Sequence, residues 1–305
     1  MVASSSPIVT FLVLAGDFAL PLQECLRSIL AQSFIDLEVL ILDTALHREP
    51  TELSQQVSRR DDRVRHLVLP SANTRFDSWN HGLRQAKGEL IWLLEPTDRL
   101  ASPQAIKDCV TQFILNPRLG LLFSRVQYLD DNGVPIERYA PPKKNSELPY
   151  HPTLYPGRLF FRQLLKANLI PAGSVIARKA CFNRAGGFQN ELGHSSAWQL
   201  WLRFSLDWQV YFDPVPKLLS RQSTQEASLH QGKSRQGLHQ LLQSFLALQD
   251  FMAAYHYPKP LQHQVQLARL QFMRRKGIKL SVGDQLLRFY RKLTTSGSPL
   301  SPLLD

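Results

Sequence analysis

The sequence predicts an α/β fold in which a mostly parallel sheet is flanked by helices. Four short apolar segments, each suited to a strand buried on both faces, fall within the first hundred residues: 8–14, 37–42, 64–69 and 89–94. Helical segments separate these strands, which is typical of βαβ units. Because open sheets of this kind bind ligands at the carboxyl ends of their strands, we expect functional residues there.

The helices are predicted from apolar spacing and from signals at their ends. Helical spacing after the first strand gives one apolar stripe, made of Leu22, Cys25, Leu26, Ile29 and Leu30. A helix over 76–86 ends at a Lys-Gly pair, and Ser102-Pro103 begins a helix that runs to about residue 115.

From residue 119 the pattern becomes less regular. The expected order is a strand to about 128, a turn at 130–133, a Pro/Lys-rich loop over 140–157, a helix over 159–167, a strand over 174–177, a helix over 198–206 and a strand over 209–212. Beyond residue 220 helical spacing returns, over 238–245, 261–272 and 282–293. We therefore expect an α/β domain over 1–230 and a basic helical extension over 231–305.

The charge of the chain is concentrated in that extension. The 305 residues carry a net charge of +11, yet the segment 231–305 holds eleven Lys or Arg against three Asp. The first 230 residues are therefore nearly balanced. A basic segment attracts nucleic acid, anionic lipid or phosphorylated ligands, and charge alone does not choose among them.

Several classes of protein are excluded by what the sequence lacks. Cys25, Cys109 and Cys181 are too far apart for a disulfide framework or a zinc site, which favours a reducing, cytoplasmic compartment. No apolar run is long enough to span a bilayer. The N-terminal apolar segment contains Asp17 and has no Lys or Arg before Arg27, so it reads as a buried strand rather than a signal peptide. The absence of G-x-G-x-x-G, G-x-x-x-x-G-K-[ST] and G-x-S-x-G argues against a dinucleotide dehydrogenase, a P-loop NTPase and an α/β-hydrolase.

Carboxylates follow two of the predicted strands. Asp43 comes after the second strand, where it could accept hydrogen bonds from a nucleotide base or ribose, or simply cap a turn. Glu95 and Asp98 follow the fourth strand and could hold a divalent ion against a diphosphate, since Mg²⁺ and Mn²⁺ prefer oxygen ligands. The alternative for this pair is an acidic loop that leads into a helix.

The order of these segments resembles the family 2 glycosyltransferases with a GT-A fold, from about residue 7 to residue 228. The opening strand, helix and nucleotide-binding strand of that family are similar to PIVTFLVLAGDFALPLQECLRSILAQSFIDLEVLILD. Its helix, strand and metal-binding segment are similar to SWNHGLRQAKGELIWLLEPTDRL. Its acceptor-side strand and Gly-Gly-Phe turn resemble LLKANLIPAGSVIARKACFNRAGGF, and the helix and basic segment that follow resemble AWQLWLRF and LLSRQS.

The resemblance implies a role for each matching residue. Asp43 would contact the base of a nucleotide-sugar donor, Asn80 would line the donor pocket, and Arg221 would meet the donor phosphate. Glu95 and Asp98 would hold Mg²⁺ or Mn²⁺ against the diphosphate, with the ion acting as a Lewis acid. On the acceptor side the resemblance places Pro171, Gly173 and Ser174.

This chain departs from the family's acidic motifs. The segment after the nucleotide strand keeps one acid of the usual two, and the metal motif reads Glu95-Pro96-Thr97-Asp98, with threonine at its central acid. The acidic pair that normally supplies the catalytic base is replaced by Ser196 and Ala197.

An inverting sugar transfer needs a group that takes the proton of the acceptor hydroxyl. Glu191 and His194 are the nearest titratable residues to the replaced pair, and they are the candidate bases.

We therefore expect a hexosyltransferase-type enzyme of polysaccharide biosynthesis. It would move a sugar from a nucleotide-sugar donor to a saccharide or lipid-linked acceptor, with metal assistance and inversion. The alternative is a non-catalytic member that binds a nucleotide, a glycan or a partner glycosyltransferase, because alanine at position 197 cannot act as a base.

The basic C-terminal segment has three interpretations. It could be a solvated helical cap on the domain, or its residues 278–305 could lie on an anionic membrane, which would make a cytoplasmic protein peripheral on the inner membrane face. Nucleic-acid binding ranks well below these two, because no nucleic-acid recognition motif is present.

Overall fold

The computed structural model describes residues 6–16, 19–44, 46–69, 74–130, 132–141, 148–221 and 235–276. The chain divides into two compact units, residues 1–244 and 245–305, and helix α9 (Arg235–Ala254) crosses the boundary between them. The expected helix over 282–293 and the segment 278–305 lie outside the described residues.

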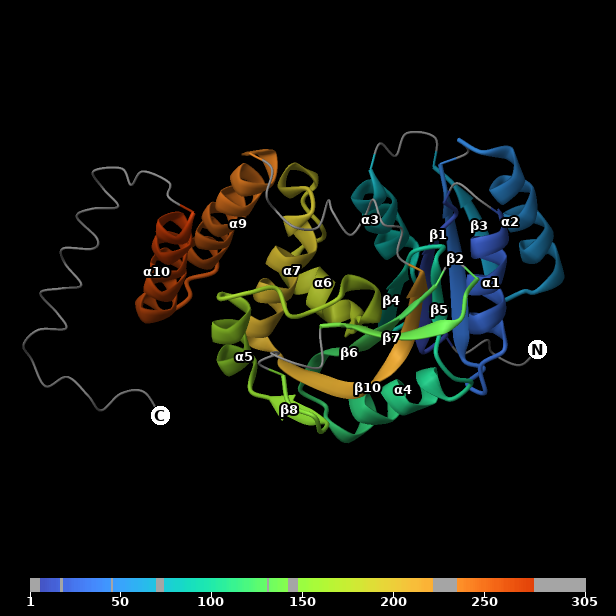
Figure 1. Ribbon diagram of the computed structural model, residues 1–305, viewed down its shortest axis with the longest axis horizontal. Helices are drawn as coiled ribbons and strands as arrows, with labels where there is room; N and C mark the ends of the chain where they lie inside the picture. The colour runs from blue at the N-terminus through green and yellow to red at the C-terminus, as the bar shows by residue number, and fades with distance from the viewer. Residues whose placement is uncertain are drawn as a thin grey trace, which may run out of the picture. The chain divides into compact units, whose positions relative to one another are not determined.

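The first unit is built on one large sheet (Figure 1). Its strands are β1 (Val9–Leu14), β2 (Leu37–Asp43), β3 (Val64–Val68), β4 (Leu90–Leu94), β5 (Asp98–Leu100), β6 (Leu119–Leu129), β7 (Pro135–Ala140), β8 (Thr153–Tyr155), β9 (Ile176–Arg178) and β10 (Gln209–Arg221). Its helices are α1 (Ala19–Leu30), α2 (Arg48–Arg60), α3 (Arg75–Gln85), α4 (Ala105–Leu115), α5 (Gly157–Leu164), α6 (Lys179–Ala185) and α7 (Ser195–Asp207), with short 3-10 turns η1 (Ala172–Ser174) and η2 (Asn190–Leu192).

The strand order is β3-β2-β1-β4-β9-β6-β10-β5, with β7 added beside β6 and β8 beside β10. The four strands predicted first, β1 to β4, pair in parallel. Strand β9 runs antiparallel to both β4 and β6, so it joins this parallel half to the rest of the sheet. The predicted α/β fold with helices around a central sheet is therefore confirmed.

The core explains why the strand predictions succeed. Every residue of β2 and β4 is buried, as expected for strands covered on both faces. The predicted apolar stripe of α1 packs into this core, with Leu22, Cys25 and Ile29 fully buried.

Several elements were not predicted from the sequence, among them α2, α6, β5 and β7. Helix α2 is strongly polar, and Leu53 and Val57 are the apolar residues that it packs against the core. Strand β5 has three residues and depends on antiparallel pairing with β10, which is distant in sequence. The expected loop over 140–157 includes the last residue of β7 and the whole of β8, both of which join the sheet.

In the second unit, residues 245–254 of α9 are followed by α10 (Lys259–Arg275). Their apolar residues form a small core, which includes Phe245, Leu248, Met252, Val265 and Leu270. Phe245 and Phe272 place their rings 6.1 Å apart, so the helices pack against each other as an antiparallel pair joined by a short turn. Among the described residues, no helix combines the length and apolarity that crossing a membrane requires.

Candidate functional site

The carboxyl ends of β2, β1 and β4 lie next to one another, because β1 pairs in parallel with both of its neighbours. Gly16, just after β1, has a positive φ of 72°, and a Cβ there would overlap Pro96 in the turn after β4. Glycine is thus required both by the backbone conformation and by this close approach. The edge brings together Asp43 at the end of β2 and Glu95 after β4, as the strand pattern predicted.

Asp43 is paired with a buried histidine, His66. His66 Nε2 lies 2.8 Å from Asp43 Oδ2, and the two side chains are 8% and 3% exposed. The parallel pairing of β2 and β3 places His66 opposite Ile41, two residues from Asp43, so both side chains leave the same face of the sheet. The sequence predicts that side chains alternate between the two faces of each strand, but it does not predict the register that places His66 beside Asp43.

Glu95 and Asp98 close a reciprocal turn. Asp98 Oδ2 accepts a hydrogen bond from the Glu95 backbone N–H at 3.0 Å, and the Asp98 N–H donates to the Glu95 carbonyl at 3.1 Å. Asp98 is only 3% exposed, whereas the Glu95 side chain is 32% exposed. The two carboxylates therefore face different surroundings although they are three residues apart.

Helix α3 brings a cation to Glu95. Arg75 Nη1 lies 3.3 Å from Glu95 Oε1, and the Arg75 guanidinium stacks over Phe76 and Trp79, 5.1 and 5.8 Å from their ring centroids. Thr74 caps the helix through a capping box with Asp77, which fixes the backbone at Arg75. Sequence analysis did not identify Arg75, because nothing local connects it to the turn after β4.

The predicted acceptor-side residues lie directly against Asp98. A Cβ added at Gly173 would come within 2.8 Å of Asp98 Oδ2, and the Gly173 carbonyl accepts a hydrogen bond from Trp92 Nε1 at 2.8 Å. Ser174 is fully buried, and both its N–H and its hydroxyl donate to the Pro171 carbonyl. The structure thus brings the 171–174 segment and the 95–98 turn together.

Arg221 also contacts this turn. Its backbone N–H donates to the Thr97 carbonyl at 3.1 Å, and its guanidinium lies 3.3 Å from Glu24 Oε2 on α1. Arg99 also approaches Glu24, at 3.8 Å, and donates to the Gly133 carbonyl. Two guanidinium groups therefore share one partly exposed carboxylate.

Asn80 holds the Gly-Gly-Phe turn. Its amide nitrogen donates to the Phe188 carbonyl and its amide oxygen accepts from the Phe188 N–H, both at 2.9 Å. A Cβ at Gly187 would overlap the Asn80 side chain, so this glycine lets the turn approach α3 closely. The predicted role of Asn80 in nucleotide binding stays a prediction, since the structure places its amide on the backbone of this turn.

The start of α7 carries the residues that replace the family's acidic pair. Ser196 is fully buried, and its hydroxyl accepts a hydrogen bond from the Gln189 N–H at 2.8 Å. Ala197 is 9% exposed. The candidate bases Glu191 and His194 are exposed on the preceding segment, which Asn190 ties to α3 through Thr74 and Asp77.

The buried part of α7 also contains an amide with no hydrogen-bond partner. Gln199 is fully buried, and neither its amide nitrogen nor its oxygen is paired within the described part of the chain.

The 95–98 turn does not fit a bound divalent ion. Mg²⁺ and Mn²⁺ need open oxygen ligands, commonly one or two carboxylates that share the ion with phosphate oxygens and water. Asp98 Oδ2 is bonded to backbone and lies against Gly173, Glu95 faces Arg75, and Thr97 between them has no carboxylate. Over the described ranges, no group of three or more His, Cys, Asp or Glu side chains is arranged to hold a metal ion.

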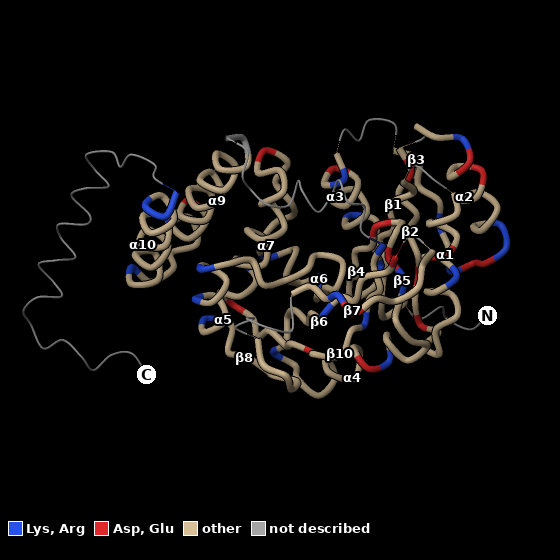
Figure 2. Tube along the Cα trace, in the orientation of Figure 1, with Lys and Arg blue, Asp and Glu red and all other residues tan. Residues whose placement is uncertain are grey.

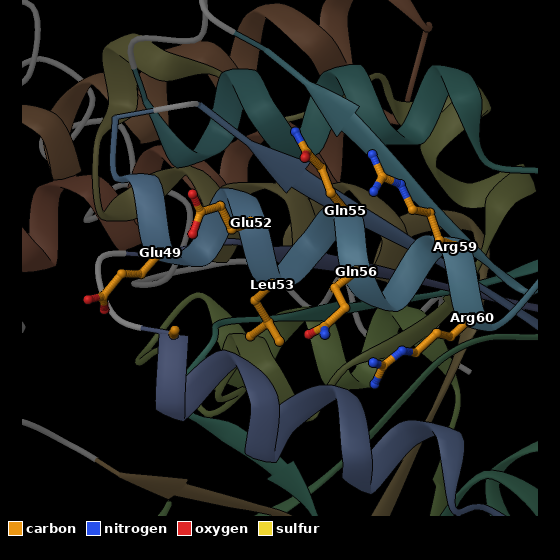
Figure 3. A pocket seen from close by; sticks show the side chains of 8 residues that line it. Glu49, Glu52, Leu53, Gln55, Gln56, Arg59 and Arg60 are labelled. Carbon is orange, nitrogen blue, oxygen red and sulfur yellow. The ribbon is translucent and has the colours of Figure 1, made fainter.

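A separate groove of about 690 Å³ runs along α2, with Ala19 at the start of α1 also lining it (Figure 3). It is lined by Ala19, Glu49, Glu52, Leu53, Gln55, Gln56, Arg59 and Arg60, none of which was predicted as a site residue. Acidic and basic residues are both spread along α2 (Figure 2), so the groove has no single charge.

Comparisons with known proteins identify the fold and the family. The model of glycosyl transferase family 2 matches residues 17–182. The chain is 30% identical over 115 residues to the O-antigen biosynthesis protein RfbC of Myxococcus xanthus, covering 37% of this chain and 9% of that protein. It is 25% identical over 152 residues to an uncharacterized glycosyltransferase of Methanocaldococcus jannaschii, covering 48% of this chain and 52% of that protein. The chain thus spans about half or less of these curated relatives.

Solved structures give the same fold at low identity. The S. aureus TarS 1–349 structure has a TM-score of 0.62 and 13% identity, covering 93% of this chain and 78% of that one. A mannosyltransferase from Pyrobaculum calidifontis, solved with GDP-Man and Mn²⁺, has a TM-score of 0.58 and 15% identity, covering 97% and 82%. The architecture is therefore that of the GT-A glycosyltransferases.

Proposed function

The chain belongs to glycosyl transferase family 2, and from this we propose that it transfers a sugar from a nucleotide-sugar donor to a saccharide or lipid-linked acceptor. The observation that carries the proposal is the contact of Gly173 with Asp98, because it joins the predicted acceptor segment to the turn predicted to face the donor phosphates. Structural neighbours were solved with UDP-GlcNAc and with GDP-Man, which supports a nucleotide-sugar donor.

The reaction we propose is a direct displacement with inversion. The acceptor oxygen attacks the anomeric carbon while the bond to the nucleoside diphosphate breaks, and the acceptor proton passes to a base. Asp43, held by His66, would orient the base of the nucleotide. Glu191 and His194 are exposed and near the start of α7, so either is accessible to take the proton.

The sequence-based prediction of Mg²⁺ or Mn²⁺ has support from the Mn²⁺ in the mannosyltransferase structure. A divalent ion would stabilise the leaving diphosphate as charge develops on it. At the 95–98 turn the cation that meets Glu95 is Arg75, and no step of the proposed reaction depends on an ion.

A screen of nucleotide sugars tests the proposal. Thermal unfolding is followed with UDP- and GDP-sugars, each with Mn²⁺ and with EDTA, and every stabilising donor is then tested for release of nucleoside diphosphate, alone and with oligosaccharide acceptors. Stabilisation together with product release is the expected result. The absence of binding by all donors would contradict any function that depends on one.

A second candidate is a non-catalytic member that binds a nucleotide, a glycan or a partner glycosyltransferase. Ser196 and Ala197 favour it, because one is committed to the Gln189 backbone and the other has no titratable group. Donor binding with no turnover for any acceptor would support this candidate. The variant Ala197→Asp separates the two further, since a gain of donor hydrolysis would show that only the base is missing.

For the basic segment we propose contact with an anionic membrane surface, through residues 278–305 of the predicted extension. The segment carries apolar and basic residues together, which is the composition of an interfacial helix. Deletion of 278–305 should abolish sedimentation with anionic vesicles. Neither the full nor the shortened chain should sediment with neutral vesicles. Equal sedimentation of the full and shortened chains would refute this contact.

A further inference from the structure

We infer that the 95–98 turn works without a bound metal, and that arginines, led by Arg75, supply the positive charge that faces the donor phosphates. The inference relies on the proposed function for the identity of the anion, a nucleoside diphosphate. The metal-free state of the turn follows from the geometry of this chain alone.

Both acids of the turn contact other groups of the protein. Asp98 is buried, and one oxygen accepts the Glu95 N–H, which shapes the turn rather than opening toward a ligand. A Cβ added at Gly173 would come within 2.8 Å of the same oxygen, so this stretch of backbone limits the room for a hydrated ion beside it. The Glu95 carboxylate is partly exposed, but the Arg75 guanidinium already pairs with it, and a cation at this position competes with a divalent ion.

Glu95 already has a cation beside it, Arg75. Arg75 meets this carboxylate at 3.3 Å and is held over two aromatic rings, so its charged group has a fixed position. An arginine stays charged at any pH at which the protein is folded, and its five N–H donors allow it to bind a carboxylate and a phosphate oxygen together. Its side chain is 36% exposed, which leaves it accessible to a ligand.

Two further arginines lie near the turn. The guanidinium groups of Arg99 and Arg221 both approach the Glu24 carboxylate, so these three residues together carry a net charge of +1. The Arg221 backbone is bonded to Thr97 and the Arg75 guanidinium meets Glu95, so both residues contact the same four-residue turn. Guanidinium groups recognise phosphates by charge-assisted, often bidentate hydrogen bonds. A diphosphate that reaches these groups would bind through their N–H donors, in place of coordination to a metal.

Binding of Mn²⁺ and of UDP and GDP to the full chain tests the inference. Free Mn²⁺ is measured by electron paramagnetic resonance during titration, and nucleotide affinity is measured by calorimetry in Mn²⁺ and in EDTA. We expect no stoichiometric Mn²⁺ binding and equal nucleotide affinity in both conditions. Arg75→Met keeps an apolar side chain over the rings. It should lower the affinity for whichever nucleotide binds, UDP or GDP, by about tenfold. The matched control is Arg48→Met, which removes an exposed ion pair on α2 and should change nothing.

Stoichiometric Mn²⁺ binding to the wild-type chain, or loss of nucleotide affinity in EDTA, would overturn the inference. Equal nucleotide affinity of Arg75→Met and wild type, with both folded, would overturn the role of Arg75. If neither UDP nor GDP binds under any condition, the proposed function fails, while the Mn²⁺ titration still decides whether the turn is free of metal.

Discussion

His66 Nε2 and Asp43 Oδ2 lie 2.8 Å apart on adjacent parallel strands, both almost completely buried. A buried carboxylate that loses a hydrogen-bond donor keeps its desolvation penalty without compensation. His66→Leu should therefore lower the free energy of unfolding by about 1–3 kcal/mol, whereas His66→Gln, which retains an N–H donor, should lower it less. Urea unfolding measures both.

The exposed His151 provides the control for this pair, because its ring lies within hydrogen-bond distance of its sequence neighbours Pro152 and Thr153. His151→Leu should leave stability unchanged. If His66→Leu is as stable as wild type but binds nucleotide more weakly, then His66 contacts the ligand itself and does not serve to hold Asp43.

Asp98 should act as a structural residue of the turn. Asp98→Ala removes the acceptor of the Glu95 N–H and should lower the free energy of unfolding by about 1–3 kcal/mol. Asp98→Asn keeps an oxygen at that place and should recover a large part of the loss. Denaturant titration of the two variants gives the comparison. A fully stable Asp98→Ala protein would show that the carboxylate is kept for a ligand.

Asn80 offers a test of the clamp between α3 and the Gly-Gly-Phe turn. Asn80→Ala removes two hydrogen bonds to Phe188, each worth about 1 kcal/mol, so unfolding should become easier by about 2 kcal/mol. Asn80→Asp keeps the acceptor and loses the donor, so its free energy of unfolding should lie between those of wild type and Asn80→Ala. Weakened nucleotide binding in a stable Asn80→Ala protein would instead support the donor-pocket role predicted from the sequence.

The fold was predictable because its central strands carry their signal locally. Strands β2 and β4 are continuous apolar runs, so their burial can be read without knowing their neighbours. Helix α2 gave no such signal, since it contacts the core through Leu53 and Val57 alone among its apolar residues and is otherwise polar. Strand β5 exists through its pairing with β10 rather than through its own three residues.

The sequence predicted which carboxylates lie at the ends of strands. It did not predict which side chains contact them. The strand order places Asp43 and Glu95 at one edge, and this follows from the parallel pairing that the pattern predicted. The partners of the carboxylates come from elsewhere in the chain: Arg75 is 20 residues from Glu95, His66 is 23 from Asp43, and Arg221 is 197 from Glu24. Periodicity indicates which side chains are buried, but it does not indicate which charge each one meets.

The three cysteines give a prediction that depends on pH. Burial raises the pKa of the Cys25 thiol, and the negative charges of Asp98 and Glu95 raise it further; burial also raises the pKa of Cys109 and of Cys181. Native protein at pH 8 should therefore react slowly with a thiol reagent, and denatured protein should react at once.

The same shift sets the sign of a stability change. An unfolded thiol ionises near pH 8.5 while the folded thiol stays protonated, so the unfolded state binds fewer protons and stability falls as pH rises above that value. Each buried thiol should contribute a loss of up to about 1.4 kcal/mol per pH unit until its folded pKa is reached. Because lysines and tyrosines also titrate in this range, the quantity to measure is the difference between wild type and Cys25→Ala in urea unfolding at pH 7.5 and 9.5, pH values chosen to bracket the unfolded thiol pKa of about 8.5. The variant should lose less stability over this interval. Equal losses, or rapid labelling of the native protein, would show that Cys25 ionises in the folded state despite its burial beside the acidic turn.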